Sequence, residues 1–154
     1  MTVGNEYDIF VDELEEPTCW RLLSRADFGR VGFIHDGELM VLPVNSAVSS
    51  HRVVFRTAGG SMLARAGNGS IVVFESDHTD RVAESGWSVL VRGQLWDVTD
   101  RPETESWHEF AVRPWAPGPQ DRWMAIEPSA ISGRMIHRNR HLPPGVRAPY
   151  MSPD

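Results

Sequence analysis

The residues best suited to chemistry in this 154-residue chain surround a pair of glycines at positions 59–60. A run of β-forming residues leads into Arg56 and Thr57, and Ser61 opens a short helical pattern after the glycines. This order predicts a strand, a tight turn and a helix whose first N–H groups face the turn, an arrangement that attracts anions. The Arg56 guanidinium and the two hydroxyls add donors for a phosphate. The alternative is a plain corner with a surface arginine, because both residue types are common at turns.

The composition excludes several other chemistries. All 15 basic side chains are arginines and the formal net charge is −6. The absence of lysine excludes Schiff-base and lysine-nucleophile catalysis, and the acidic balance argues against general nucleic-acid binding, which needs a basic surface. Cys19 is the only cysteine, so an internal disulfide and a cysteine-cluster metal site are excluded. We expect Cys19 to be an inert packing residue.

The length and hydropathy predict one domain without a membrane segment. A chain of this size is long enough to bury a core of its own. No apolar run approaches the roughly 20 residues that a membrane span needs, and the N-terminus lacks a signal-peptide pattern. We therefore expect a cytoplasmic protein that binds neither membranes nor nucleic acid.

The first third of the chain predicts an arm, a helix and a hairpin. Residues 1–12 are acidic and without periodicity, which indicates a flexible arm. Pro17 suits the first turn of a helix, whose apolar face includes Cys19, and Gly29 is expected to end this helix. The period then changes to two, and residues 30–34 and 39–44 flank an Asp-Gly turn, the sequence signature of a β-hairpin.

The remainder predicts more strands with few helices. Strands are expected at residues 52–57, 71–75, 86–98, 123–126 and 131–137. Residues 77–85 are polar and predict a loop, Gly93 predicts a bend within the long strand, and Asp100 is expected to cap a helix that begins near Pro102. Closely spaced strands without a helix between each pair predict a mainly β protein, an antiparallel sheet or barrel with a few peripheral helices.

Several short motifs occur in a characteristic order. They are Gly29-Arg30-Val31-Gly32, Pro43-Val44-Asn45, Phe55-Arg56-Thr57, Gly60-Ser61-Met62-Leu63, Phe74-Glu75, Gly86-Trp87-Ser88-Val89, Arg113-Pro114-Trp115-Ala116-Pro117-Gly118 and Ser132-Gly133-Arg134. In this order the chain resembles the pyridoxamine 5′-phosphate oxidase-like, FMN-binding split-barrel proteins over residues 13–137. The resemblance implies a six-stranded antiparallel split β-barrel with Greek-key topology, assembled as a homodimer with a flavin in each of two interface clefts. The expected organisation is an arm at 1–12, an FMN-binding split-barrel domain at 13–140 and a Pro-rich tail at 141–154.

The resemblance also implies which positions contact the cofactor. These are Pro43, Val44 and Asn45 for the flavin ring, Phe55, Arg56, Thr57, Ser61, Met62 and Leu63 around the ribityl phosphate, Trp87, Ser88 and Val89 on the cleft wall, and Arg113 and Trp115 from the partner chain. The other tryptophans, Trp20, Trp96, Trp107 and Trp123, are expected in packing or dimer contacts.

Position 62 departs from the family pattern. The family usually has a lysine after the serine of the Gly-Ser pair, and here that residue is Met62. The loss of this cation is expected to weaken phosphate binding by about 1.5–3 kcal/mol. Arg56 is retained, and Arg65 lies one helical turn beyond Ser61, so either arginine can compensate.

The resemblance implies a flavin-dependent oxidoreductase that acts on a small planar substrate, with NAD(P)H as the electron donor. The redox chemistry belongs to the flavin ring, so no catalytic side chain and no metal ligand is expected. The alternatives are an F420-dependent reductase, a flavin-binding protein without turnover, and a haem-binding protein. The haem alternative needs an axial ligand, and His137 and His141 are expected to be solvated near the tail.

Overall fold

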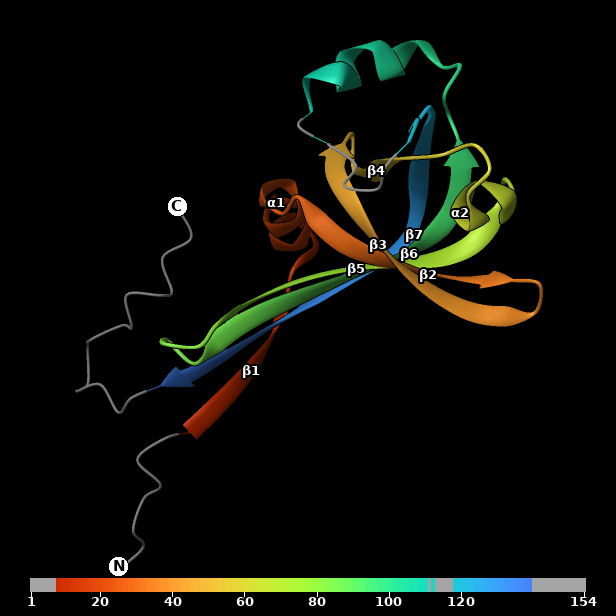
Figure 1. Cartoon of the computed structure of the whole chain (residues 1–154). Helices are drawn as coiled ribbons and strands as arrows, with labels where there is room; N and C mark the ends of the chain where they lie inside the picture. The colour runs from red at the N-terminus through yellow and green to blue at the C-terminus, as the bar shows by residue number, and fades with distance from the viewer. Residues whose placement is uncertain (1–7, 111, 113–117, 140–154) are drawn as a thin grey trace, which may run out of the picture.

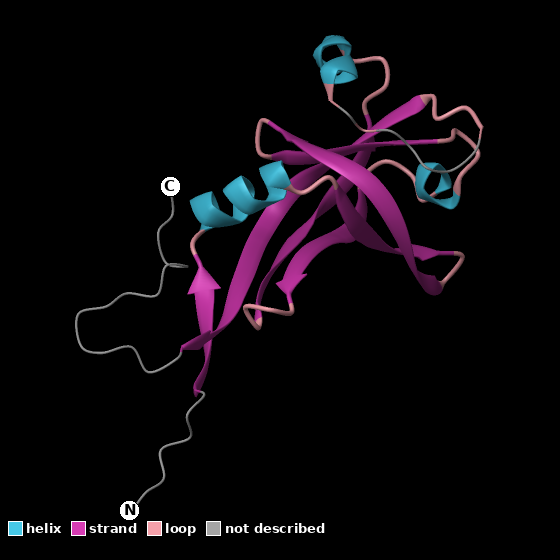
Figure 2. Cartoon of the chain, turned by 60° about the vertical axis from the view of Figure 1, so that its left-hand side comes forward, coloured by secondary structure: helices cyan, strands magenta, loops and turns pink. Residues whose placement is uncertain are grey.

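The computed structural model describes residues 8–110, 112 and 118–139 as a curved antiparallel sheet with three short helical segments around it (Figures 1 and 2). The strands are β1 (Asp8–Leu14), β2 (Phe28–His35), β3 (Glu38–Ser49), β4 (Arg52–Thr57), β5 (Ser70–Asp80), β6 (Ser85–Asp97) and β7 (Arg122–Asn139). The helical segments are α1 (Glu16–Arg25), α2 (Met62–Arg65) and the 3₁₀ helix η1 (Pro102–Glu109).

The sheet closes on itself as a barrel. Its strand order is β1-β7-β4-β3-β2-β5-β6, and β6 also pairs with β7, so a ring of pairings passes through every strand except β1. The sheet therefore has seven strands rather than the six expected. The difference arises because residues 8–12, expected as part of a flexible arm, belong to β1, which pairs with residues 133–139 of β7. Arm residues 1–7 and the tail from residue 140 lie outside the described part of the chain.

The predicted hairpin is confirmed as β2 and β3. At its turn both Asp36 and Gly37 have positive φ, 50° and 77°, which matches the right-handed twist of the strands. Pro43 lies opposite Arg30 of β2, whereas the pairing of β3 with β4 covers only residues 46–49. Pro43 therefore lies in the half of β3 that has left β4, where a missing donor costs no ladder hydrogen bond on that side.

Gly29 does not end the first helix, as had been expected. Helix α1 ends at Arg25, and Gly29 lies inside β2, where it is buried. A Cβ at this position would lie 2.3 Å from Cζ of Phe74 and 2.5 Å from the carbonyl oxygen of Glu75. Glycine is required because β5 approaches the backbone of β2 closely, not because the helix stops there.

The segment expected as a loop at residues 77–85 is mostly strand. β5 continues to Asp80 and β6 begins at Ser85, so only residues 81–84 form the turn. The Asp80 carboxylate accepts hydrogen bonds from the N–H groups of Val82 and Ala83, at 2.9 Å each, and closes the turn. The polar sequence of residues 77–85 indicated an exposed loop. These residues are mostly strand because β5 and β6 pair along the whole length of their hairpin.

The two last predicted strands form one strand, and the predicted bend in β6 is confirmed. β7 runs without interruption through residues 127–130, which separated the two predictions. Its register with β6 shifts between Arg92 and Gly93, where Gly93 lies opposite Pro128. This bulge accommodates the proline, so the strand bends instead of ending.

The buried apolar residues form two clusters on the two faces of the sheet. The barrel core fills the interior with side chains such as Val31, Phe33, Phe55, Phe74 and Ile126. The outer cluster lies outside the barrel and consists of Val54, Val98, Trp107, Val112, Trp123 and Ala125. Helix η1 contributes Trp107 to this outer cluster, and its N-cap is Arg101 instead of the expected Asp100.

The only cysteine is buried, as the helical pattern predicted. Cys19 is 0% exposed, its thiol lies 3.8 Å from the carbonyl oxygen of Leu14, and burial raises the pKa of that thiol. We expect no reaction with a chromogenic disulfide reagent under native, mildly alkaline conditions, and one equivalent of reaction after unfolding in denaturant. Rapid stoichiometric labelling of the native protein would contradict this expectation.

Candidate functional site

The predicted strand–turn–helix corner is present at the end of β4. Oγ1 of Thr57 and Oγ of Ser61 lie 2.7 Å apart, and the Ser61 oxygen accepts the N–H of Ala64 at 3.1 Å as the N-cap of α2. The turn is closed by a hydrogen bond from the Ser61 N–H to the carbonyl oxygen of Ala58, at 3.0 Å. Helix α2 has only four residues, so its dipole is smaller than expected and the side chains must provide most of any anion affinity.

Arg56 lies on the outer face of β4, behind this corner. Phe55 points into the barrel core, and successive strand residues face opposite sides, so Arg56 faces the outer cluster. Its Cζ lies 5.3 Å from the centre of the Trp123 ring. The Arg56 Nε atom is buried and has no hydrogen-bond partner among the described residues.

Among the described residues three arginines are half-buried, and Arg56 alone lacks a carboxylate partner. Nη2 of Arg52 lies 3.0 Å from Oε1 of Glu103, and Nε of Arg122 lies 3.0 Å from Oδ2 of Asp97. A partly buried guanidinium without a counter-ion is unfavourable. The unpaired charge of Arg56 therefore fits a bound anion.

The two glycines of the corner differ in what they offer a ligand. The N–H of Gly59 already donates to Oδ1 of Asp121, at 3.1 Å, so this carboxylate occupies one donor that a phosphate could have used. A Cβ built on Gly60 would meet no atom within 4 Å. The room for a phosphate therefore lies on the Gly60 side of the turn, away from the Asp121 charge.

The other predicted phosphate-site residues lie partly in the core. Leu63 and Phe55 are 3% and 0% exposed, so their side chains face the barrel interior. Met62 is half-buried and packs against the same core, whereas Arg65 is exposed. The Met62 side chain thus supports the fold at the position where the family usually has a cation.

The predicted flavin-ring segment lies beside the corner. Ser46 pairs with Phe55 of β4, and Asn45, one residue earlier, pairs with Phe28 of β2. Val44 is buried and Asn45 is half-buried. Residues 43–45 therefore lie alongside residues 28–30 at the start of β2, with Asn45 nearest to β4.

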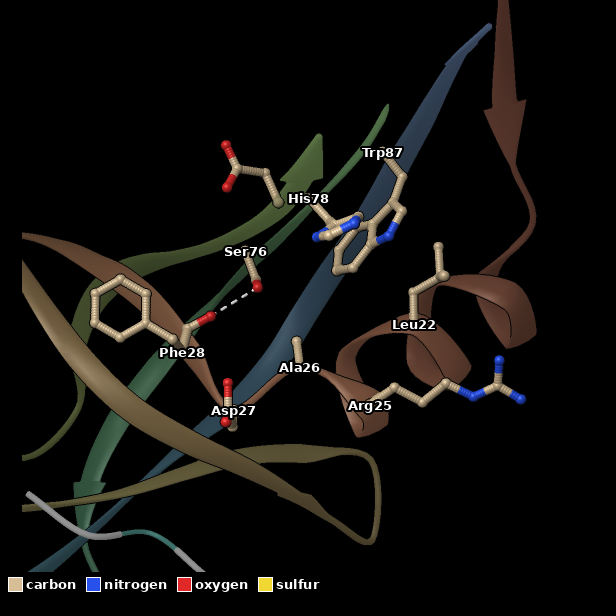
Figure 3. Close-up of a pocket in the computed structure, with 9 residues that line it drawn as sticks. Leu22, Arg25, Ala26, Asp27, Phe28, Ser76, His78 and Trp87 are labelled. Carbon is tan, nitrogen blue, oxygen red and sulfur yellow. Dashed lines mark hydrogen bonds between the residues drawn. The ribbon is translucent and has the colours of Figure 1, made fainter. Parts of the chain in front are cut away.

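A pocket of about 380 Å³ opens beyond Phe28 (Figure 3). It is lined by Leu22, Arg25, Ala26, Asp27, Phe28, Ser76, Asp77, His78 and Trp87. Figure 3 shows the His78 and Trp87 rings close together on one wall and the Ser76 hydroxyl donating to the Phe28 carbonyl oxygen, at 2.8 Å. Sequence analysis pointed to Trp87 but not to the other residues of the pocket, because α1, β2 and β5 meet there only in the folded chain.

One protomer does not bring Trp87 to the Arg56 corner. Around the ring, β4 and β6 are separated by β3, β2 and β5 on one side and by β7 on the other. On β7, Arg56 pairs with Trp123 and Trp87 pairs with Met135, twelve residues further along. Figure 1 shows α2 and the tip of the β5–β6 hairpin on opposite sides of the molecule.

The remaining predicted cleft residues have different surroundings. Ser88 is exposed beside a smaller cavity of about 150 Å³ next to Trp87, whereas Val89 is 0% exposed. Arg113 and Trp115 lie outside the described residues.

Within the described part of the chain, no three His, Cys, Asp or Glu side chains are arranged to hold a metal ion. Nε2 of His137 lies 2.8 Å from Oδ2 of Asp12, the acceptor of this hydrogen bond, and the His137 ring stacks on Phe10. His141 lies outside the described residues. The same part of the chain contains no helix with the length and apolar character of a membrane span.

The described strands form a closed antiparallel barrel of β2 to β7, with β1 paired to β7 outside the ring. Consistent with this fold, the family model described as pyridoxamine 5′-phosphate oxidase matches residues 15–135. The chain therefore belongs to the pyridoxamine 5′-phosphate oxidase family, and the resemblance found in the motifs is confirmed.

Relatives and solved structures agree with this assignment. The uncharacterized protein Rv0080 of Mycobacterium tuberculosis is 35% identical over 138 residues, which cover 86% of this chain and 90% of that protein. The FAD binding protein from Mycobacterium smegmatis is 33% identical, with a TM-score of 0.70 over 80% of this chain and 98% of the other. An FAD-binding protein from Mesorhizobium loti, 20% identical, has the same fold, with a TM-score of 0.66 over 84% and 98% of the two chains.

Proposed function

We propose that the chain binds FMN through its phosphate and acts as a flavin-dependent oxidoreductase. The observation that carries this proposal is the half-buried Arg56, which lacks a carboxylate partner and lies beside the paired hydroxyls of Thr57 and Ser61. Arg56 and Thr57 leave opposite faces of β4, so both can reach one phosphate only if it lies beyond the end of the strand. The open side of Gly60 is at that end.

The same argument supports a homodimer. Residues 43–45 would receive the flavin ring in one protomer, and Trp87, which lies away from the Arg56 corner of its own chain, would contact that ring from a second copy. Ile34, Leu39 and Val41 share one face of the β2–β3 hairpin and are 57%, 74% and 60% exposed. An apolar patch of this kind is typical of a surface that a partner covers.

The proposed chemistry assigns binding and orientation to the protein. A bound flavin would supply the electron transfer, with NAD(P)H as donor. Arg56, Thr57 and Ser61 would fix the phosphate and residues 43–45 would orient the ring. The Trp87 pocket would take a small planar substrate, because an indole face suits flat rings.

FAD is a second candidate cofactor. The M. smegmatis and M. loti proteins are both named as FAD-binding, and the pocket beyond Phe28 has the size to hold part of a larger nucleotide. F420 remains a further candidate, because it also carries a phosphate at the end of a ribityl chain. FMN is the simplest ligand that uses the corner at the end of β4.

The first test is to titrate the purified protein with FMN, FAD, F420 and riboflavin and to monitor binding by the fluorescence of each ligand. We expect sub-micromolar FMN binding and at least tenfold weaker binding of riboflavin, which lacks the phosphate. NAD(P)H oxidation by the loaded protein then separates an enzyme from a flavin-binding protein without turnover. Failure of all four ligands to bind would contradict the proposal.

A further inference from the structure

We infer that Trp123 is a positioning residue that holds the Arg56 guanidinium in place for the cofactor phosphate. The inference rests on the proposed function and adds a residue that the sequence had assigned to packing or dimer contacts. It begins with the strand register. Arg56 of β4 and Trp123 of β7 are direct cross-strand partners, so their side chains leave the same face of the sheet.

The Trp123 ring is a fixed platform. Trp123 is 4% exposed, its ring meets the Trp107 ring edge-on at 5.5 Å and 71°, and His108 contacts it at 6.2 Å and 75°. Its backbone N–H donates to Oγ1 of Thr99 at 3.0 Å. Because the ring is held on several sides, the cation over it has a defined position.

A neighbouring arginine shows what is distinctive about this arrangement. Arg52 lies four residues before Arg56 on β4, so both side chains leave the same face of the sheet. The Cζ atom of Arg52 lies 5.6 Å from the centre of the Trp107 ring, and its Nη2 atom lies 3.0 Å from Oε1 of Glu103. Arg56 has a comparable ring contact, 5.3 Å, but no carboxylate partner among the described residues. The Arg56 guanidinium is therefore held by the Trp123 ring and not by an ion pair.

The geometry of a guanidinium explains why this leaves room for an anion. A ring binds the flat face of the guanidinium, whereas phosphate oxygens accept hydrogen bonds from its N–H edge. The two partners therefore do not compete. A carboxylate in place of the ring would neutralise the charge and occupy that edge, as Glu103 does for Arg52.

The test compares dissociation constants for FMN and riboflavin, because their ratio isolates the phosphate contribution. Full-length wild type, Trp123→Phe and Trp123→Leu are measured, with Trp20→Phe as a control that also alters a buried tryptophan but packs in the barrel core. We expect Trp123→Leu to reduce the preference for FMN by roughly 5- to 30-fold and Trp123→Phe by less, since phenylalanine keeps a weaker cation–π contact. Trp20→Phe should keep the wild-type ratio.

A double-mutant cycle with Arg56→Ala completes the test. If Trp123 acts through Arg56, adding Trp123→Leu to Arg56→Ala should cause no further loss of FMN preference. An unchanged ratio in Trp123→Leu, or equal weakening of both ligands, would overturn the inference while leaving the FMN proposal intact. Absence of any FMN binding by wild type would overturn both.

Discussion

Replacing Arg56 with alanine is expected to raise the dissociation constant for FMN by roughly 10- to 150-fold and to leave that for riboflavin nearly unchanged. Hydrogen bonds from a guanidinium to a phosphate are charge-assisted and contribute about 1.5–3 kcal/mol. The effect should be large here because the chain has no lysine and Arg65, the other arginine that could compensate, is exposed. Isothermal titration with both ligands measures the difference directly.

Arg52→Ala is the matched control for this prediction. Arg52 lies on the same strand and face as Arg56 and also contacts a tryptophan ring, but its charge is already paired with Glu103. We expect Arg52→Ala to leave FMN binding unchanged. The melting temperature of unliganded Arg56→Ala should also stay close to wild type, because the lost ring contact is offset by removal of an unpaired, half-buried charge. Equal loss of FMN and riboflavin affinity would show that Arg56 supports the fold instead of binding phosphate.

Replacing Met62 with lysine is expected to tighten FMN binding by roughly 10-fold or more, while riboflavin binding changes little. Met62 is the first residue of α2, directly after Ser61. The corner has two half-buried cations, Arg56 and Arg122, and the charge of Arg122 is already paired with Asp97. A lysine stem can cover the apolar surface that Met62 now covers and extend its ammonium to the solvent side. The added charge would then lie next to the phosphate.

Met62→Leu separates the effect of charge from that of packing. Leucine conserves the volume and apolar character of the side chain, so this variant should bind FMN like wild type. Tighter binding in both variants would assign the gain to packing of α2. No gain in Met62→Lys would indicate that the phosphate lies away from the start of α2, and the assignment of Ser61 would then need revision.

The local elements could be predicted from the sequence because short-range chemistry determines them. The Asp-Gly turn fixes the β2–β3 hairpin, since both turn residues adopt positive φ. The run of β-forming residues 53–55 defines β4, and the Thr57–Ser61 corner follows from its turn residues and N-cap. The apolar face of α1 correctly indicated that Cys19 is buried. The family could also be recognised from the sequence, because its short motifs occur in a fixed order along the chain.

The long-range features were decided by the tertiary structure. Residues 8–12 have no strand pattern of their own, yet they pair with β7 because that strand extends beyond its pairing with β4. Residues 77–80 were expected to be loop because they are polar, but they are strand because they pair with residues 85–88 across the β5–β6 hairpin.

The candidate site shows the same division. The residue types of the phosphate corner could be recognised from their order, but the surroundings of Arg56 could not. Its platform, Trp123, is 67 residues away and becomes its neighbour only through the β4–β7 register. Likewise, Asp121 reaches the Gly59 N–H across 62 residues. Sequence order determines which chemical groups are available, whereas strand pairing determines which of them meet, because cross-strand contacts depend on register and not on separation along the chain.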